Sequence, residues 1–288
     1  MSKYTSLLLK VHIHPLLWIV AGLSIVTAQF KELCMLFLIV FCHEMGHAVC
    51  ARFFSWRVKT IMLLPFGGVV EVDEHGNRPF KEDLFVTLFG PLQHIPMQLV
   101  VYLLFQMNIL SVDTFKLFTL LNASIFVFNL IPIWPLDGGK LLFLWFSHIR
   151  PFSIAHRMVI IASSAILGLM VLALVFLAPF ALNLWLIIGF ILYSLYIEYK
   201  QRKYAYIRFL MERYYGKKHE FLSLKPLEVN EEEFLYEVLL KFQRGCKHPI
   251  IVYQNGNKKF QIDENEVLHA FFKEKRTNAR MGELAYVY

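Results

Sequence analysis

Long apolar segments separated by short polar loops constrain this chain more than any other feature. They fill roughly the first two thirds of its 288 residues, and beyond Glu198 the sequence becomes rich in Lys, Arg and Glu. A run of about 20 apolar residues is long enough to cross a bilayer as a helix. Only 18% of the residues are charged, whereas a soluble domain has about a quarter. The pattern predicts an α-helical polytopic membrane domain followed by a small soluble domain.

The apolar segments predict six membrane-spanning helices, and the fourth is interrupted by Pro and Gly. Lys and Arg gather at the N-terminus, in the second and fourth loops, and after the sixth span; the other loops have no net basic excess. The positive-inside rule then predicts that both termini lie in the cytoplasm. The same basic loops account for the formal charge of +7, so we expect no nucleic-acid partner. The predicted spans are 15–29, 33–54, 83–106, 115–146 with a break over 130–140, 159–177 and 184–196.

The second predicted span contains the sequence His-Glu-Met-Gly-His at 43–47. His43 and His47 are four residues apart, so on a helix they lie on one face about one turn apart. In zinc hydrolases two such imidazoles hold the metal, and the intervening carboxylate takes a proton from water. The motif predicts His43 and His47 as zinc ligands and Glu44 as the catalytic base. Cys42 and Cys50 flank it, and we interpret them as buried thiols rather than ligands.

A third zinc ligand is expected, because catalytic zinc sites usually take three protein ligands and leave one position open. Asp137 is the best candidate. It lies in the interrupted fourth segment, where an unpaired carboxylate is costly. An aspartate that caps the next helix is the alternative interpretation. Glu71 and Asp73 are weaker candidates, since their loop is charged and easily solvated.

Two further stretches are candidates for contact with a substrate. Asn129 precedes the break and is predicted to position the substrate or stabilise an oxyanion, although a packing asparagine would look the same. Residues 60–72 predict a hairpin or re-entrant loop whose edge can pair with an extended peptide, with an interfacial connector as the alternative. The predicted substrate-binding residues are Pro65, Phe66, Gly67, Gly68 and Pro135.

These motifs resemble those of the site-2 protease family of intramembrane zinc metalloproteases. The family's second motif is Asn/Asp-x-x-Pro followed by Asp-Gly, and here Asn129, Pro132, Asp137 and Gly138 supply it together with 43–47. The resemblance implies one zinc ion per chain and peptide-bond hydrolysis inside the membrane.

The likeness extends to 65–70 and to Gly90-Pro91 in the third span. The sequence departs from the family just after this dipeptide, where Gln93 and His94 replace the expected small or Asn residues. His94 is predicted either as a residue of a polar pathway or as a satisfied interior histidine.

The layout of six spans with a C-terminal domain resembles a sporulation branch of that family. The branch implies removal of the N-terminal pro-sequence from a membrane-associated sigma-factor precursor, pro-sigma-K. It implies restraint by membrane inhibitor proteins. It also implies a location in the membrane surrounding the forespore, with the site facing the mother cell.

The remaining third of the chain predicts a linker helix over 204–221 and a domain over 222–288, after a membrane domain over 1–203. A strand is predicted over 222–229, and Asn230 is predicted to cap a helix over 231–242. Strands over 248–254 and 258–263 and a helix over 264–275 follow. This βαββα order resembles a cystathionine-β-synthase (CBS) domain. Such modules work in pairs and bind adenine nucleotides, so a single copy implies a homo-oligomer and regulation by ATP. A packing domain without ligand is the alternative.

Three other functions compete with this interpretation. A protease of the same type could act on another membrane-anchored substrate, such as an anti-sigma factor. A membrane metal transporter could use the same histidines and aspartate, although Glu44 beside His43 is what hydrolysis requires. An inert membrane receptor would have no need of the intact motif.

Overall fold

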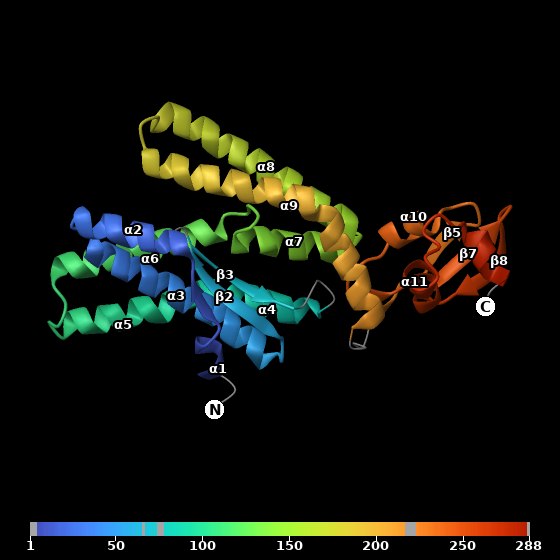
Figure 1. The fold of residues 1–288 in the computed structure, drawn as a ribbon, viewed down its shortest axis with the longest axis horizontal. Helices are drawn as coiled ribbons and strands as arrows, with labels where there is room; N and C mark the ends of the chain where they lie inside the picture. The colour runs from blue at the N-terminus through green and yellow to red at the C-terminus, as the bar shows by residue number, and fades with distance from the viewer. Residues whose placement is uncertain (1–4, 65–66, 74–77, 217–222, 287–288) are drawn as a thin grey trace. The chain divides into compact units, whose positions relative to one another are not determined.

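The structure of the protein is a computed structural model that describes residues 5–64, 67–73, 78–216 and 223–286. The chain divides into two compact units (Figure 1). We call the first the membrane unit; it comprises Met1–Glu74, Lys81–Leu142 and Ala162–Leu195. We call the second the tail unit; it comprises His75–Phe80, Phe143–Ile161 and Tyr196–Tyr288.

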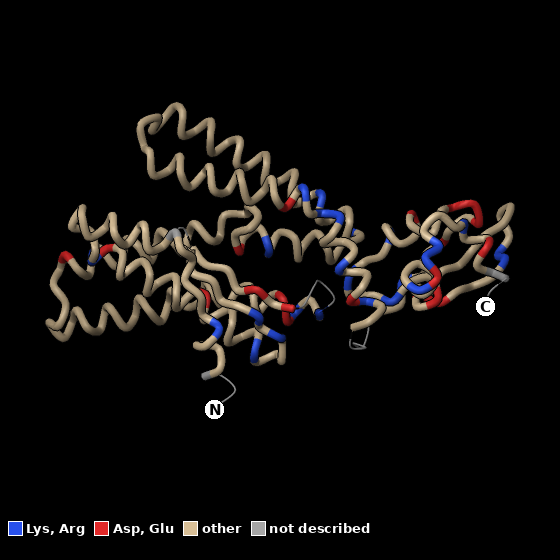
Figure 2. The backbone as a smooth tube through the Cα atoms, viewed as in Figure 1, with Lys and Arg blue, Asp and Glu red and all other residues tan. Residues whose placement is uncertain are grey.

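Helices make up most of the first 215 residues. Charged residues are sparse along them and frequent in the tail (Figure 2). Four helices, which begin at Phe80, Asp137, Phe152 and Leu182, contribute residues to both units. The helices are α1 (Thr5–Leu8), α2 (Pro15–Val26), α3 (Phe30–Phe53), α4 (Phe80–Leu92), α5 (His94–Gln106), α6 (Val112–Leu130), α7 (Asp137–Ile149), α8 (Phe152–Leu177) and α9 (Leu182–Tyr215).

In the described chain, four helical segments are long and apolar enough to cross a membrane, by length and composition: Phe30–Phe53, Phe80–Gln106, Phe152–Leu177 and Leu182–Tyr215. The predicted first span corresponds to the 12-residue helix α2. The predicted fourth span is divided between α6 and α7 by a non-helical stretch over 131–136. The helical polytopic architecture is therefore present, whereas the count of six spans stays a prediction.

A three-stranded sheet interrupts the helices of the membrane unit. Strands β2 (Val58–Leu64) and β3 (Gly67–Val72) pair antiparallel, which confirms the predicted hairpin. Strand β1 (Val11–Ile13) pairs parallel with β2. The sequence interpretation missed β1, because it joined the apolar residues before α2 to the first span.

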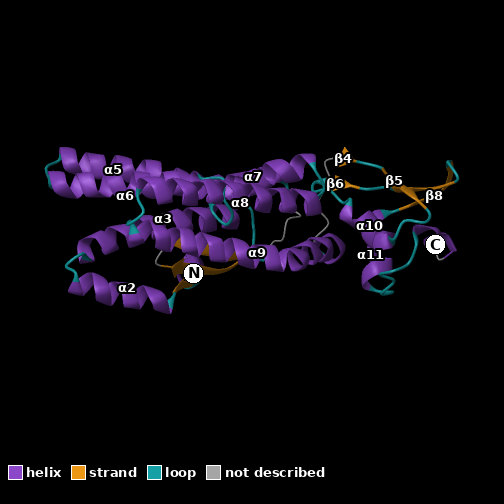
Figure 3. Ribbon diagram, turned by 90° about the horizontal axis from the view of Figure 1, so that it is seen from above, coloured by secondary structure: helices purple, strands orange, loops and turns teal. Residues whose placement is uncertain are grey.

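The sheet packs on the C-terminal half of α3. Val58 and Ile61 of β2 share a buried cluster with Ala48 and Ala51 of α3 and with Trp56. The small alanines allow the strand to approach the helix closely, and Figure 3 shows the strands beside α3. The sheet is thereby fixed next to the turn of α3 that carries the histidine motif.

The tail contains a second three-stranded sheet, in the order β5-β7-β8. Strands β5 and β7 are parallel, and β7 and β8 are antiparallel. The predicted βαββα order is present. The predicted strand over 222–229 corresponds to two strands, β4 and β5. The pairing of β4 with the short strand β6 and the 3₁₀ helix η1 were not predicted. The elements are β4 (Ser223–Leu224), β5 (Leu227–Asn230), α10 (Leu235–Leu240), β6 (Cys246–Lys247), β7 (Ile250–Gln254), β8 (Asn257–Ile262), α11 (Glu264–Phe272) and η1 (Met281–Tyr286).

The predicted cap of the first tail helix is wrong. Asn230 ends β5, and its side-chain oxygen accepts a hydrogen bond from the N–H of Glu232, so a turn precedes the helix. Helix α10 begins only at Leu235. The N–H of Phe234, just before it, donates to the carboxylate of Glu237. Glu237, the third residue of the helix, thus satisfies the N–H of the residue that precedes the helix, as in a capping box.

The core of the tail unit includes residues from the adjoining helices. The ring of Phe152, at the start of α8, stacks on Phe209 of α9 with centroids 4.3 Å apart. Both belong to the buried cluster that contains Phe242, Val252 and Leu268 of the tail. Residues 204–215 continue α9 without a break, so the end of this helix forms part of the tail core.

Candidate metal centre

The two histidines and the aspartate predicted to bind zinc lie together in the membrane unit. His43 and His47 are one turn apart on α3, and Asp137 is the first residue of α7. Asp137 Oδ2 lies 3.1 Å from His43 Nε2 and 3.0 Å from His47 Nε2, and the two Nε2 atoms are 3.1 Å apart. All three residues are buried. Among the residues that the structure describes, this is the one cluster of three or more His, Cys, Asp or Glu side chains suited to a metal ion.

The cluster fits a cation better than it fits hydrogen bonds. His47 Nδ1 lies 2.7 Å from the carbonyl oxygen of Val86, so this nitrogen carries a proton and donates it. In the neutral ring Nε2 is then a bare lone pair. It faces the carboxylate oxygen of Asp137, and two lone pairs at this distance repel unless a cation lies between them.

The dimensions of the cluster agree with zinc. In a tetrahedral site with bonds of about 2.0–2.1 Å, two ligand atoms lie about 3.3 Å apart. The three contacts between His43, His47 and Asp137 measure 3.0–3.1 Å. The three residues therefore meet the donor type, number and spacing of a catalytic zinc site.

Two glycines bring other backbone segments against this site. A Cβ atom at Gly90 of α4 would lie 2.1 Å from His47 Nε2, and one at Gly68 of β3 would lie 2.4 Å from Glu44 Cγ. Both distances are below 3.0 Å, which real Cβ atoms essentially never show. Only glycine therefore allows α4 and β3 to pack where they do.

Glu44 lies between the helix and the hairpin. It is 6% exposed, and the backbone of Gly68 hydrogen-bonds its carboxylate. The predicted base and the predicted substrate-binding strand are thus in direct contact. A peptide aligned along β3 would pass close to the carboxylate of Glu44.

The second oxygen of Asp137 is held by a lysine. Lys140 Nζ lies 3.0 Å from Asp137 Oδ1, while Oδ2 faces the two histidines. The lysine is three residues further along α7, a spacing that brings side chains together on a helix. This arrangement leaves Asp137 one oxygen for a metal ion and explains how a buried carboxylate is kept charged.

Among the residues that the structure describes, the other predicted site residues form no hydrogen bond or ion pair with the metal cluster. Asn129 is half-buried near the end of α6, and its side-chain amide donates to the carbonyl oxygen of Ile125. Pro135 follows a cis peptide bond in the stretch between α6 and α7. Gly67 begins β3, next to Gly68. Pro65 and Phe66 lie outside the described residues.

The weaker candidates for the third ligand have other partners. Glu71 accepts a hydrogen bond from the hydroxyl of Thr60, and Asp73 lies 2.8 Å from Lys59 Nζ. These contacts are on the exposed part of the hairpin. Asp137 therefore stands as the carboxylate that meets both histidines.

Two further residues touch the cluster: sequence reasoning missed Lys140 and left the role of His94 open. Lys140 had been counted only as part of the break in the fourth span. His94 was noted as a histidine in an apolar span, and its Nε2 lies 3.1 Å from His43 Nδ1. The signal for Lys140 was its spacing of three residues from Asp137 in a segment otherwise poor in charge.

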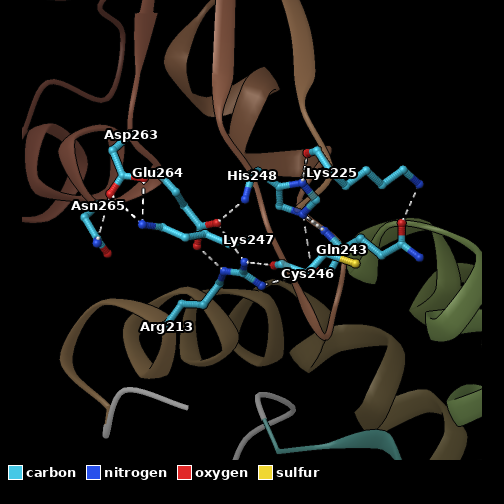
Figure 4. A network of polar contacts seen from close by, with 9 residues as sticks. All are labelled: Arg213, Lys225, Gln243, Cys246, Lys247, His248, Asp263, Glu264 and Asn265. Carbon is cyan, nitrogen blue, oxygen red and sulfur yellow. Dashed lines mark hydrogen bonds and ion pairs between the residues drawn. The ribbon is translucent and has the colours of Figure 1, made fainter. Parts of the chain in front are cut away.

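A separate polar network lies in the tail unit (Figure 4). Arg213 of α9 forms an ion pair with Glu264 of α11, and the two side chains are 0% and 3% exposed. Arg213 also donates to the carbonyl oxygens of Gln243 and Cys246. The N–H of His248 donates to the carboxylate of Glu264 over 2.8 Å. The network anchors the end of α9 in the tail.

Burial lowers the pKa of two side chains in this region. It lowers the pKa of His248, whose Nε2 accepts a hydrogen bond from the N–H of Gln243 while Nδ1 donates to the carbonyl oxygen of Lys225. Burial also lowers the pKa of Arg244 to about 10. The contacts of His248 are those of a neutral ring.

Comparison with known proteins connects the whole chain to one group. Residues 31–111 and 106–175 match the sequence model of Peptidase family M50. The chain is 51% identical over 288 residues, 100% of both chains, to Stage IV sporulation protein FB of Bacillus subtilis (strain 168). It is 31% identical over 148 residues to a zinc metalloprotease of Methanocaldococcus jannaschii, covering 49% of this chain and 43% of that protein.

A solved structure shares the fold. The site-2 protease from Methanocaldococcus jannaschii superposes with a TM-score of 0.53 and 25% sequence identity, covering 65% of this chain and 89% of that chain. The matched segments of the sequence model contain all three residues of the metal cluster.

Proposed function

Because this chain belongs to peptidase family M50, we propose that His43, His47 and Asp137 hold its zinc ion and that Glu44 is its general base. The chain is a zinc metalloprotease of the site-2 type. The observation that carries the residue assignment is the buried triangle of ligand atoms with sides of 3.0–3.1 Å.

Each group at the site has a separate role in peptide-bond hydrolysis. Bound zinc supplies a Lewis acid that makes water a nucleophile near neutral pH. Glu44 takes the proton of the attacking water and delivers it to the leaving amine. Asn129 orients the substrate or donates to the developing oxyanion. Lys140 holds Asp137 in place through its second oxygen.

The hairpin is proposed to receive the substrate. Strand β3 has β2 on one side, and the other edge has no partner strand among the described residues. An extended peptide can add to such an edge through backbone hydrogen bonds. The residues assigned to this contact from the sequence pattern are Pro65, Phe66, Gly67, Gly68 and Pro135.

The proposed substrate is a sigma-factor precursor, pro-sigma-K, whose N-terminal pro-sequence is removed. The support is the resemblance of the sequence to the sporulation branch and the 51% full-length identity to a protein named for stage IV of sporulation. The same resemblance supports membrane inhibitor proteins as partners. It also supports a location in the membrane surrounding the forespore, with the site facing the mother cell.

The proposed topology has six crossings and both termini in the cytoplasm. The crossings would be α2, α3, α4–α5, α6–α7, α8 and α9. The basic loops support this orientation. The test places single cysteines in each loop of the full chain and labels intact cells with a reagent that cannot cross the membrane. Labelling of the second loop, which is predicted to be cytoplasmic, would contradict the topology.

The proposed regulation is by ATP at the CBS-like tail, in a homo-oligomer that pairs two tails. The support is the βαββα order of elements in a single copy. Titration of the full chain with ATP, measuring binding and cleavage, tests the idea. Absence of both effects would refute it.

The enzymatic assignment is tested with a matched pair of variants on α3. Full chains carrying Glu44→Gln or Glu32→Gln are incorporated into vesicles with pro-sigma-K, and cleavage and zinc content are measured. Glu44→Gln should lower the rate by about 10²–10⁴-fold, the usual contribution of a general base, and keep its zinc. Glu32 is exposed in the first turn of the same helix, so Glu32→Gln should behave as the wild type.

The outcomes separate the alternatives. Full activity of Glu44→Gln would overturn the assignment of the base. Cleavage of an anti-sigma factor but not of pro-sigma-K would keep the mechanism and replace the substrate. Zinc uptake into the vesicles without any peptidase activity would favour the metal transporter.

A further inference from the structure

A chain of buried polar side chains leads away from His43 on the side opposite the metal cluster. His43 Nδ1 lies 3.1 Å from His94 Nε2, and His94 Nδ1 lies 2.7 Å from Asn122 Oδ1. His94 and Asn122 are 3% and 4% exposed. The three residues come from α3, α5 and α6, so the contacts join three helices of the membrane unit. Buried polar groups of this kind need defined partners.

The direction of each hydrogen bond among these buried side chains follows from the role of His43. If His43 binds the metal through Nε2, its proton is on Nδ1 and is donated to His94 Nε2. His94 Nε2 is then the acceptor, so the proton of His94 is on Nδ1 and is donated to Asn122 Oδ1. The other tautomer of His94 would place two N–H groups face to face and leave a bare nitrogen against a carbonyl oxygen.

The amide groups beyond His94 fit the same direction. Asn122 Nδ2 donates to the backbone carbonyl oxygen of His94 over 3.0 Å and to Gln98 Oε1 over 3.2 Å. Gln98 Nε2 donates to the hydroxyl of Thr119 over 2.9 Å. Each donor of the chain thus meets an acceptor, and the orientation of the Asn122 amide is fixed by its two acceptors.

The two ligand histidines are held in different ways. His47 donates to the backbone carbonyl of Val86, which no side-chain substitution removes. His43 donates to a side chain. In metal sites the acceptor of the ligand's second N–H fixes the ring and its tautomer, and loss of that acceptor typically costs 10–100-fold in metal affinity.

We propose that His94 is a positioning residue that accepts the Nδ1–H of His43 and so orients this ring for zinc, with Asn122 holding His94 in the accepting tautomer. The proposal rests on the zinc site of the proposed function. It assigns a role to the histidine at which the sequence departs from the site-2 protease pattern.

The test compares zinc affinities of full chains in detergent, measured by competition with a chelator. His94→Leu removes the acceptor with little change of volume and should weaken zinc binding about 10–100-fold. His94→Gln places an oxygen near the position of Nε2 and should restore most of the affinity. Thr119→Val is the control, because it alters the far end of the same chain and should leave the affinity within about threefold of wild type. Unchanged affinity in His94→Leu would overturn the proposal.

A measurement on the wild type covers the case in which His94→Leu does not fold. The ¹⁵N resonances of the zinc-bound chain with labelled histidines should show His94 protonated on Nδ1 and bare on Nε2, with the assignment made by His94→Gln. A proton on His94 Nε2 would refute the proposal. The proposed function fails separately, if the wild type binds no zinc or if Glu44→Gln retains full cleavage.

Discussion

Gly90→Ala should expel zinc although it replaces none of the proposed ligand residues. The new Cβ would lie 2.1 Å from His47 Nε2, and ordinary van der Waals contact begins at 3.4 Å. The histidine ring or α4 must therefore move by about 1.3 Å, the difference between 3.4 and 2.1 Å. Zinc–ligand distances tolerate deviations of about 0.2 Å. The loss of affinity should exceed the 10–100-fold that follows removal of an outer partner.

The matched control is Gly168→Ala in α8, where a Cβ would meet nothing within 4 Å. Both changes replace a helical glycine by alanine, and alanine by itself stabilises a helix by about 0.5–1 kcal/mol relative to glycine. Zinc content and cleavage of the two full-length variants are measured side by side. Gly168→Ala should match the wild type in both. Normal zinc affinity in Gly90→Ala would refute the inferred contact between α4 and His47.

Three further outcomes are expected. Gly68→Ala should lower cleavage and leave zinc bound, because its Cβ would lie 2.4 Å from Glu44 Cγ and displace the base rather than a ligand; loss of zinc instead would contradict this. Glu264→Gln should destabilise the tail by about 3–5 kcal/mol, since it removes the negative charge that pairs with the buried guanidinium of Arg213; unchanged hydrogen exchange of tail amides in the full chain would count against it. The pKa of His248 is lowered in the folded tail, so below about pH 6.5 the unfolded chain binds a proton that the folded one does not. Tail stability should therefore fall as pH drops below that value, and His248→Gln should reduce the slope.

The residues of the metal cluster could be predicted because each needs a partner wherever it lies in the fold. A His-Glu-x-x-His spacing on a helix and a carboxylate among apolar residues each require a partner, and the structure brings His43, His47 and Asp137 together. The hairpin was predictable from β-branched residues on both sides of the Gly67-Gly68 pair.

Other features could not be read from the sequence because they depend on tertiary contacts. Strand β1 is three residues long and is defined by its pairing with β2, so its local pattern resembles the start of an apolar helix. The tautomer of His94 and the pairing of Lys140 with Asp137 follow from the neighbours that α3, α5 and α7 bring together. Phe152 lies in the core of the tail although it is about 90 residues away from Phe242 in the sequence. Its backbone N–H donates to the carbonyl oxygen of Phe242.

X-ray absorption at the zinc edge of the purified full chain is the most direct test of the metal centre. We expect a shell of nitrogen and oxygen at about 2.0–2.2 Å, with two imidazoles, and no sulfur at about 2.3 Å. Asp137→Ala should remove one oxygen from that shell or abolish zinc binding. A sulfur ligand from Cys42 or Cys50, or a spectrum with no imidazole, would contradict the assignment of His43, His47 and Asp137.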